Sequence, residues 1–413
     1  MSTKQKAWSV KENNLDKFIK IVFFIVSPIF GFLYSLKNIK TKSSYVIFFL
    51  TAICFGISFT VERQSGNEND FDSFFYREEF ESFQSVDYLE YIDGLKDFLS
   101  FDEGRKDYYY ETIAFFVSRF TNNYHYLFAV FAIVFSFFAL KTFRFLTEEE
   151  NFKNNLSSYI LAYIFLTNQI FNINGVRFWT AAWVAVFIVF QVFRNKKYQY
   201  LLLMALLPFM HGSYWIFIFV VFVYILLSRF YRIFIALFFF SFIFSSISLQ
   251  LAKDSTSFLP VFLAKLIDSY TSAETIEKVS AQGTGFFWIA KIFKTVSFTY
   301  MNLLVYLFIR NEKLIKENFK TESLYKFLLV LVTFANFTMS IPSLGGRFFL
   351  LSYPIIAYIW LINFGKNRYK YILYFFPLAF FFNIYEQLIL YLKVTGVYFY
   401  ISSPFYIVYE YLF

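Results

Sequence analysis

Residues 124–146 read YHYLFAVFAIVFSFFALKTFRFL, a run that is apolar at almost every position. A helix needs about 20 mainly apolar residues to cross the hydrocarbon core of a bilayer. The whole chain is 58% hydrophobic and 25% aromatic, whereas soluble domains average about 45–50% apolar residues. The strands of a β-barrel would show alternating polarity over about 10 residues, and this run does not alternate. The sequence therefore predicts an all-α polytopic integral membrane protein.

Similar runs recur along the chain and predict about 12 transmembrane helices within a single transmembrane domain, residues 1–413. No internal repeat or separate soluble domain interrupts them. The predicted spans are Phe18–Leu36, Tyr45–Val61, Tyr124–Leu146, Leu156–Phe171, Phe178–Phe193, Tyr198–Phe209, Tyr214–Leu227, Phe230–Leu249, Phe286–Ile309, Leu324–Ile341, Phe348–Phe364 and Tyr371–Leu392.

The distribution of charge predicts the orientation of these spans. The net charge is +9, yet residues 62–111 contain 15 acidic and 5 basic residues. The remaining basic residues stand in short loops such as 37–42, 194–197, 310–320 and 365–370, which the positive-inside rule assigns to the cytoplasm. Because the positive charge is scattered in this way, we do not expect nucleic acid as a partner.

The loops that alternate with the basic ones should face outward. The acidic segment 62–111 carries aromatic and aliphatic residues at helical spacing, which predicts amphipathic helices on the membrane surface. Residues 250–285 form a second external loop. The N-terminus conflicts with this scheme, because it would lie outside although it contains Lys4, Lys6 and Lys11. Either the first span does not cross simply, or a basic extension is translocated.

Cysteine and histidine usage limits the chemistry. The single Cys54 excludes an intrachain disulfide. The two histidines, His125 and His211, have no cysteine or carboxylate at ligand spacing, so we expect neither a metal site nor a cofactor. Because polar residues precede a long first apolar run, we expect no cleavable signal sequence.

Three cationic or titratable residues interrupt apolar runs at the predicted external ends of spans: Arg177, His211 and Arg347. Such residues are costly at a membrane and mark functional sites. Arg177 opens a helix, whose N-terminus already favours anions, and its planar fork suits phosphate. His211 could act as a base or bind a sugar hydroxyl. The alternative is that both arginines reach to lipid headgroups and that His211 is an interfacial residue.

Other residues are weaker candidates. Lys291 and Lys294 share one face of a predicted helix, and could bind pyrophosphate or extend to headgroups. Asp72 could be a base or a sugar ligand, although any acid in this segment is a surface charge by default. Glu386 lies within the last apolar run and should face the bundle interior.

The order of these residues resembles the EpsG-like group of the Wzy-type polysaccharide repeat-unit polymerases. That group carries an arginine and an Asp-x-x-x-Tyr element after the second span, then Asn-x-x-Arg, then a histidine. The matching residues are Arg63, Asp72-Ser-Phe-Phe-Tyr76, Asn174-Gly-Val-Arg177 and His211. The chain departs from the pattern in lacking the glycine just before the aspartate and in having Phe178 where Gln or Glu often follows the arginine.

The resemblance implies a GT-C-like glycosyltransferase of the bacterial cytoplasmic membrane, with its active site facing the periplasm or exterior. It would polymerise undecaprenyl-pyrophosphate-linked oligosaccharide repeat units at the outer leaflet, for O-antigen, capsule or exopolysaccharide. His211, Arg177 and Asp72 would be catalytic, and a chain-length regulator is a further expected partner. The alternatives are an O-antigen ligase or another lipid-linked-donor glycosyltransferase, and a lipid-linked oligosaccharide flippase. The expected substrate-binding residues are Arg347, Arg63, Asn174, Tyr76, Lys291, Lys294 and Glu386.

Overall fold

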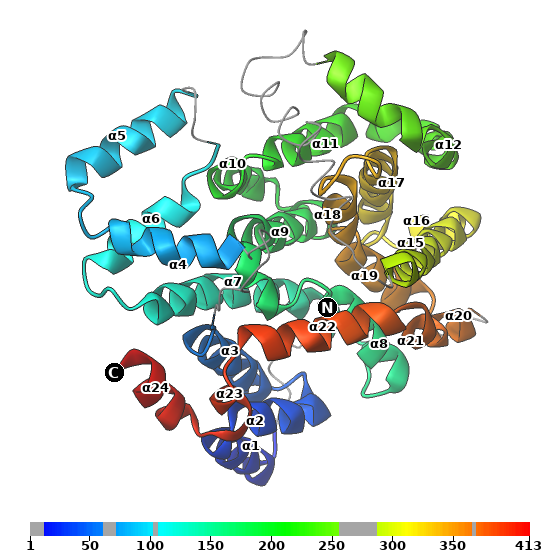
Figure 1. The fold of residues 1–413 in the computed structure, drawn as a ribbon. Helices are drawn as coiled ribbons and strands as arrows, with labels where there is room; N and C mark the ends of the chain where they lie inside the picture. Colours follow the sequence, from blue (N-terminus) through cyan, green and yellow to red (C-terminus); the bar gives the residue numbers. More distant parts are fainter. Residues whose placement is uncertain (1–11, 61–71, 102–105, 256–286, 366–368) are drawn as a thin grey trace.

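The computed structural model describes residues 12–60, 72–101, 106–255, 287–365 and 369–413. These residues fold into helices (Figure 1), with one isolated antiparallel bridge between Phe59 and Thr395. The first half contains α1 (Asn14–Val26), α2 (Pro28–Ser35), α3 (Lys42–Ile57), α4 (Asp72–Ser82), α5 (Tyr88–Leu99), α6 (Tyr109–Ser118), α7 (Tyr124–Thr147), α8 (Leu156–Phe165), the 3₁₀ turn η2 (Ile170–Gly175) and α9 (Val176–Val189). The second half contains η3 (Phe190–Arg194), η4 (Tyr198–Ala205), α10 (Leu206–Met210), α11 (Tyr214–Leu227), α12 (Tyr231–Ser255), α15 (Phe287–Arg310), α16 (Glu312–Lys316), α17 (Glu322–Phe337), α18 (Gly345–Leu350), α19 (Tyr353–Asn363), α20 (Lys370–Tyr374), α21 (Phe376–Ala379), α22 (Phe381–Val394), α23 (Tyr398–Ile401) and α24 (Pro404–Leu412).

The structure supports a multi-pass membrane protein and does not confirm the number of twelve spans. In the described residues, five continuous helical stretches are long and apolar enough to cross a bilayer, and a sixth counts if the pair bent by 51° after Ala379 is one span. The five stretches are Tyr124–Thr147, Leu156–Arg194, Tyr214–Phe244, Ala290–Arg310 and Gly345–Asn363. Several predicted spans are shorter helices, such as Lys42–Ile57 and Tyr198–Met210.

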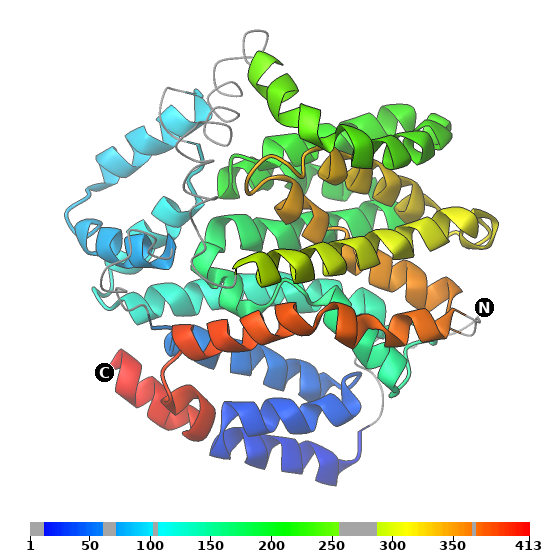
Figure 2. The ribbon, with the colours of Figure 1, turned by 45° about the vertical axis from the view of Figure 1, so that its right-hand side comes forward.

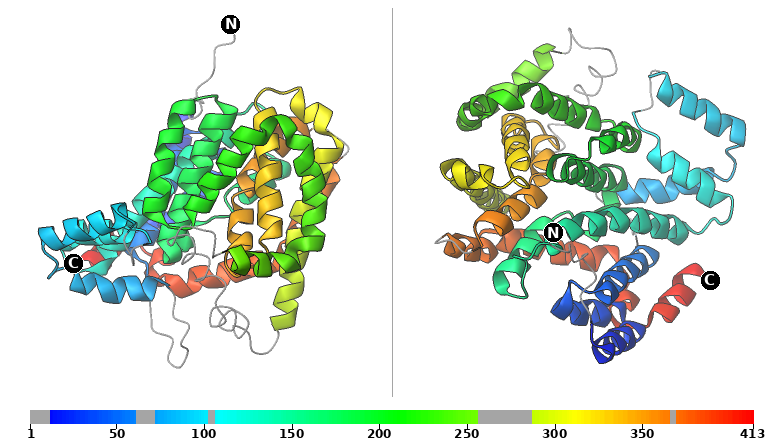
Figure 3. Two further views of the ribbon diagram at one scale, coloured as in Figure 1. Left: turned by 90° about the horizontal axis from the view of Figure 1, so that it is seen from above. Right: turned by 180° about the vertical axis from the view of Figure 1, so that it is seen from behind.

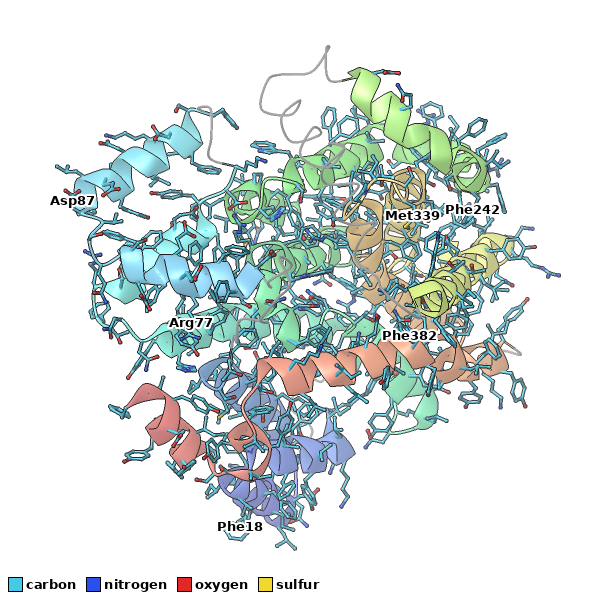
Figure 4. All side chains as sticks on the ribbon, in the orientation of Figure 1. Phe18, Arg77, Asp87, Phe242, Met339 and Phe382 are labelled. Carbon is cyan, nitrogen blue, oxygen red and sulfur yellow. The ribbon has the colours of Figure 1, made fainter. Side chains whose placement is uncertain are left out.

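Large apolar side chains point outward from the helices (Figure 4). Phe18 on α1 is 62% exposed and Phe242 on α12 is 45% exposed. In water such a surface would drive aggregation, whereas lipid chains solvate it at no cost. The exposed aromatic side chains therefore agree with a bundle surrounded by lipid.

Small residues allow the helices to approach closely. A Cβ atom on Gly56 of α3 would lie 2.5 Å from the Cβ of Ala132 and 2.6 Å from the carbonyl oxygen of Phe128 on α7. Such contacts between small residues are typical of helix pairs in membranes, where van der Waals packing holds helices together. The helix α3 consequently packs directly against the backbone of α7.

The helices bring the described parts of the predicted basic loops to one end of the bundle and those of the acidic segment to the other. At the basic end, Glu149 accepts hydrogen bonds from Arg194 and Lys320. At the opposite end, Arg177 pairs with Asp107. In Figure 2 the helices α16 and α20 lie at the right end, and α4 and α5 lie at the left end. The alternation of loops predicted from charge agrees with this arrangement.

The acidic segment contains helices, as its spacing predicts. Helices α4 and α5 lie beside the bundle, crosswise to α11 and α12 (Figure 3, left). Asp87 caps α5 by accepting a hydrogen bond from the backbone N–H of Glu90 at 2.8 Å. Of the second predicted external loop, 250–285, residues 256–285 lie outside the described residues.

The predicted span Phe18–Leu36 is wrong as a single crossing. The chain breaks between α1 and α2, where Ser27 caps α2 through its side chain and Pro28 occupies the first helical position. A proline there lacks only an N–H that the helix does not use. The two helices then fold against each other so closely that a Cβ on Gly31 would lie 2.6 Å from the Cβ of Phe24.

Polar contacts show that this hairpin starts and ends at the same end of the bundle. The Asp16 carboxylate, near the start of α1, accepts hydrogen bonds from Tyr34 at 3.0 Å and Asn38 at 2.7 Å. The buried Lys20 ammonium donates to Thr41 Oγ1 at 2.7 Å. The start of α1 therefore lies beside the basic loop 37–42, and the conflict over the N-terminal lysines resolves in favour of a first segment that does not cross simply.

Candidate functional site

The centre of the candidate site is Arg177, in the first turn of α9. Its Nε donates to the Tyr76 hydroxyl at 3.0 Å, and its Nη1 donates to Asp107 Oδ1 at 3.0 Å. A guanidinium has five N–H groups, so three remain for a ligand after these two bonds. The Arg177 side chain is 35% exposed whereas Asp107 is 5% exposed. The Arg177 guanidinium is thus held by a carboxylate and a phenol, and part of it remains accessible. It does not simply extend to lipid headgroups.

The two predicted motifs meet at this point. Asn174 Oδ1 accepts a hydrogen bond from Ser73 Oγ at 2.5 Å. A Cβ on Gly175 would lie 3.5 Å from Asp72 Oδ2, so the Asp72 carboxylate lies beside the turn that leads into α9. The Tyr76 backbone carbonyl accepts from the Tyr110 hydroxyl at 2.8 Å. Residues about a hundred positions apart in the sequence therefore form one cluster, which holds Asp72 and Tyr76 next to Asn174 and Arg177.

Phe178 brings the other two predicted residues to the same place. The Arg347 guanidinium lies over the Phe178 ring, 5.2 Å from its centroid. The His211 ring meets Phe178 edge-on, with centroids 5.3 Å apart. Among the described residues, no carboxylate forms an ion pair with Arg347. We call the two arginines Arg177 and Arg347, together with His211, whose ring both charges act on, the cation cluster. Its positive charge is on the two guanidinium groups, and among the described residues their one ion pair is that of Arg177 with Asp107.

The hydrogen bonds of His211 define its chemical form. The backbone N–H of Ser213 donates to His211 Nδ1 at 3.2 Å, and the Ser213 hydroxyl lies 2.8 Å from the same nitrogen. Because Nδ1 accepts, the ring hydrogen is on Nε2. Burial lowers the pKa of His211 to about 3, and the neighbouring Arg177, Arg347 and Lys106 add to this effect. His211 is therefore a neutral hydrogen-bond donor, and this geometry favours that role over the predicted role of base.

A cavity of about 410 Å³ opens beside Arg177, between α4, α5 and α6. Two of its acids, Asp107 and Glu111, are functional candidates that the sequence did not single out. Burial raises the pKa of Asp107, against the opposing effect of the Arg177 guanidinium. Burial also raises the pKa of Glu111 to about 7, and its buried Oε2 has no hydrogen-bond partner among the residues that the structure describes. The cavity is lined by Glu79, Ser82, Phe83, Val86, Glu90, Tyr91, Lys106, Asp107, Tyr108, Glu111 and Arg177.

The remaining candidates lie elsewhere. Lys294 on α15 forms an ion pair with Glu386 on α22, with N and O 3.4 Å apart. Lys291 is exposed on α15. Glu386 is half-buried and faces α15, where the Lys294 ammonium compensates its charge. Arg63 lies outside the described residues. In the part of the chain that the structure describes, no three His, Cys, Asp or Glu side chains group closely enough to hold a metal ion.

Comparisons with known proteins give no match: no family model, curated protein or solved structure resembles this chain significantly. A functional assignment consequently depends on the cation cluster, the adjoining cavity and their position at one end of a membrane bundle.

Proposed function

We propose that this protein is a membrane glycosyltransferase that polymerises undecaprenyl-pyrophosphate-linked oligosaccharide repeat units at the outer leaflet of the bacterial cytoplasmic membrane. The observation that carries the proposal is the cation cluster. Its residues come from three separate predicted external loops, yet they meet beside the acidic segment.

The chemistry of a lipid-linked donor explains why cations are needed. When the bond between the sugar and the pyrophosphate breaks, the leaving group gains negative charge. Arg177 and Arg347 can bind its phosphate oxygens with planar N–H groups, and neutral His211 can donate a further hydrogen bond from Nε2. Hydrogen-bond donors that are already held in position before the reaction stabilise such charge most effectively. Arg177 is fixed by Asp107 and Tyr76, and Arg347 is supported by the Phe178 ring.

Two alternative functions would also use a lipid-linked glycan. An O-antigen ligase would use the same donor and a different acceptor. A flippase would place its polar site near the bilayer midplane, whereas the cation cluster lies at the end of the bundle where α4 and α6 pack. The Lys294–Glu386 ion pair between α15 and α22 is a feature that a transporter could share.

Deletion of the gene separates these functions in the cell. Without the polymerase, export and ligation continue, so we expect the surface glycan to carry a single repeat unit instead of long chains. The measurement is the size distribution of the surface glycan by gel electrophoresis, with the gene restored on a plasmid as the control. Loss of all lipid-linked repeat units from the outer leaflet would point to the flippase instead.

A further inference from the structure

The cavity beside Arg177 differs in charge from the cation cluster. Its wall contains four carboxylates, those of Glu79, Glu90, Asp107 and Glu111, and two cations, those of Lys106 and Arg177. A second pyrophosphate would be repelled by this excess of negative charge. Carboxylates accept hydrogen bonds from hydroxyl groups, and a cavity of about 410 Å³ has room for a small saccharide. The cavity is therefore suited to a ligand rich in hydroxyl groups.

Ring stacking and hydrogen bonds connect the walls of the cavity. Tyr91 stacks on Phe115 with ring centroids 4.3 Å apart, and the Tyr108 hydroxyl donates to the Tyr91 backbone carbonyl at 2.6 Å. The Tyr108 backbone N–H in turn donates to the carbonyl of Phe209, two residues before His211. These contacts connect the wall of the cavity to the chain just before His211.

Arg177 links the two regions, because it lines the cavity and lies close enough to His211 for its charge to act on the imidazole. On the basis of the proposed function, we infer that the cavity holds the acceptor saccharide, and that Glu111 takes the proton from the attacking hydroxyl while the cation cluster holds the donor pyrophosphate.

Glu111 has the environment that a base requires. It lies in the first turn of α6, four residues after Asp107, and the charged groups that act on it are Asp107, Arg177 and Glu79 of α4. Its Oε2 is buried and unpaired in the described residues. Because burial raises the pKa of Glu111 to about 7, the group can both accept and release a proton near neutral pH.

The acceptor oxygen forms a bond to the anomeric carbon of the donor, and the bond from that carbon to the pyrophosphate oxygen breaks. The electron pair leaves with the lipid pyrophosphate, whose charge the cation cluster stabilises. The acceptor proton moves to the Glu111 carboxylate and then to solvent. No oxidant, reductant or further reactant is consumed.

The test uses purified full-length protein and lipid-linked repeat units extracted from the deletion strain. We expect the elongation rate of the wild type to increase with pH through about 7 as Glu111 ionises. The Glu111→Gln variant should lose about 10²–10⁴-fold in rate, the typical contribution of general base catalysis, together with this pH dependence. Its affinity for undecaprenyl pyrophosphate should remain unchanged. Formate should restore part of the activity of Glu111→Ala, and the exposed Glu81→Gln on α4 should behave as wild type.

The other outcomes distinguish failure of the proposed function from failure of the role of Glu111. If the wild type does not elongate the units, the proposed function is wrong and the inference falls with it. If the wild type elongates them and Glu111→Gln keeps the same rate and pH profile, only the inference is wrong. Loss of undecaprenyl pyrophosphate binding in Glu111→Gln would also contradict the inference, because it would show that Glu111 maintains the donor site.

Discussion

Replacing Arg177 by lysine should reduce chain elongation by about 10²–10³-fold, the usual cost of removing one fixed donor from a transition-state site. Lysine keeps the charge, but a single ammonium cannot reproduce the planar fork that binds Tyr76, Asp107 and a phosphate together. In the structure the guanidinium contacts Tyr76 and Asp107, each at 3.0 Å. The measurement is the elongation rate of purified protein with lipid-linked repeat units.

The matched control is Arg229→Lys, an exposed arginine beyond α11 at the basic end, which should keep the wild-type rate. Since Arg177→Lys also disturbs the buried Asp107 carboxylate, the purified variant must first elute as a single folded species. A folded Arg177→Lys protein with wild-type chain lengths and rates would remove Arg177 from the site.

The largest effect on stability should come from Glu149, at the opposite end of the bundle. Its carboxylate accepts hydrogen bonds from Arg194 at 2.5 Å, Lys320 at 2.7 Å and Tyr358 at 2.7 Å. These partners come from three different segments, and Glu149 is only 8% exposed. Removing one member of a buried ion pair costs about 3–5 kcal/mol, because the partner charge stays buried. We therefore expect Glu149→Ala to lower the free energy of unfolding by that amount.

The measurement is thermal unfolding of the purified protein in detergent, with the neighbouring exposed Glu150→Ala as control. Burial alone would raise the pKa of Glu149, but the hydrogen bonds from Lys320, Tyr358 and Arg194 outweigh it and lower the pKa. A carboxyl with a lowered pKa contributes stability above its unfolded pKa and loses it as the pH falls through the folded value. The difference between wild type and Glu149→Ala should accordingly shrink in acid. Equal unfolding temperatures for the two variants at neutral pH would contradict this role.

The three residues of the cation cluster could be identified from the sequence. Arg177, His211 and Arg347 could be identified because each interrupts an apolar run at its end, and polar groups in such places are rare. That they meet could not be predicted, because it depends on how α9, α10 and α18 pack. Phe178, a departure from the family pattern, is the residue that the Arg347 and His211 side chains share.

The sequence did not show which acidic residues of the segment 62–111 belong to the candidate site. Asp107 and Glu111 are two of 15 acidic residues there, and burial, which distinguishes them, is a property of the folded chain. One signal was present, since both flank the three consecutive tyrosines 108–110, whose large rings are buried. Nothing in the sequence predicted the pairing of Lys294 with Glu386, because this pairing depends on the contact of α15 with α22.

The break in the first apolar run did have a sequence signal. Ser27 followed by Pro28 is the typical start of a helix, a capping side chain and then a residue without an N–H. Hydropathy counts such a run as one span, because it averages over the residues and ignores the cap. The N-terminal lysines were the second sign that this segment does not cross simply.

The central claim is that the protein forms glycosidic bonds between lipid-linked units, and reconstitution tests it most directly. Purified protein would be placed in liposomes that contain repeat units from the deletion strain, and both the glycan length and the released undecaprenyl pyrophosphate would be measured. The account predicts a ladder of longer lipid-linked glycans, with one undecaprenyl pyrophosphate released for every bond formed. Units that cross the bilayer unchanged, with no release of undecaprenyl pyrophosphate, would contradict it.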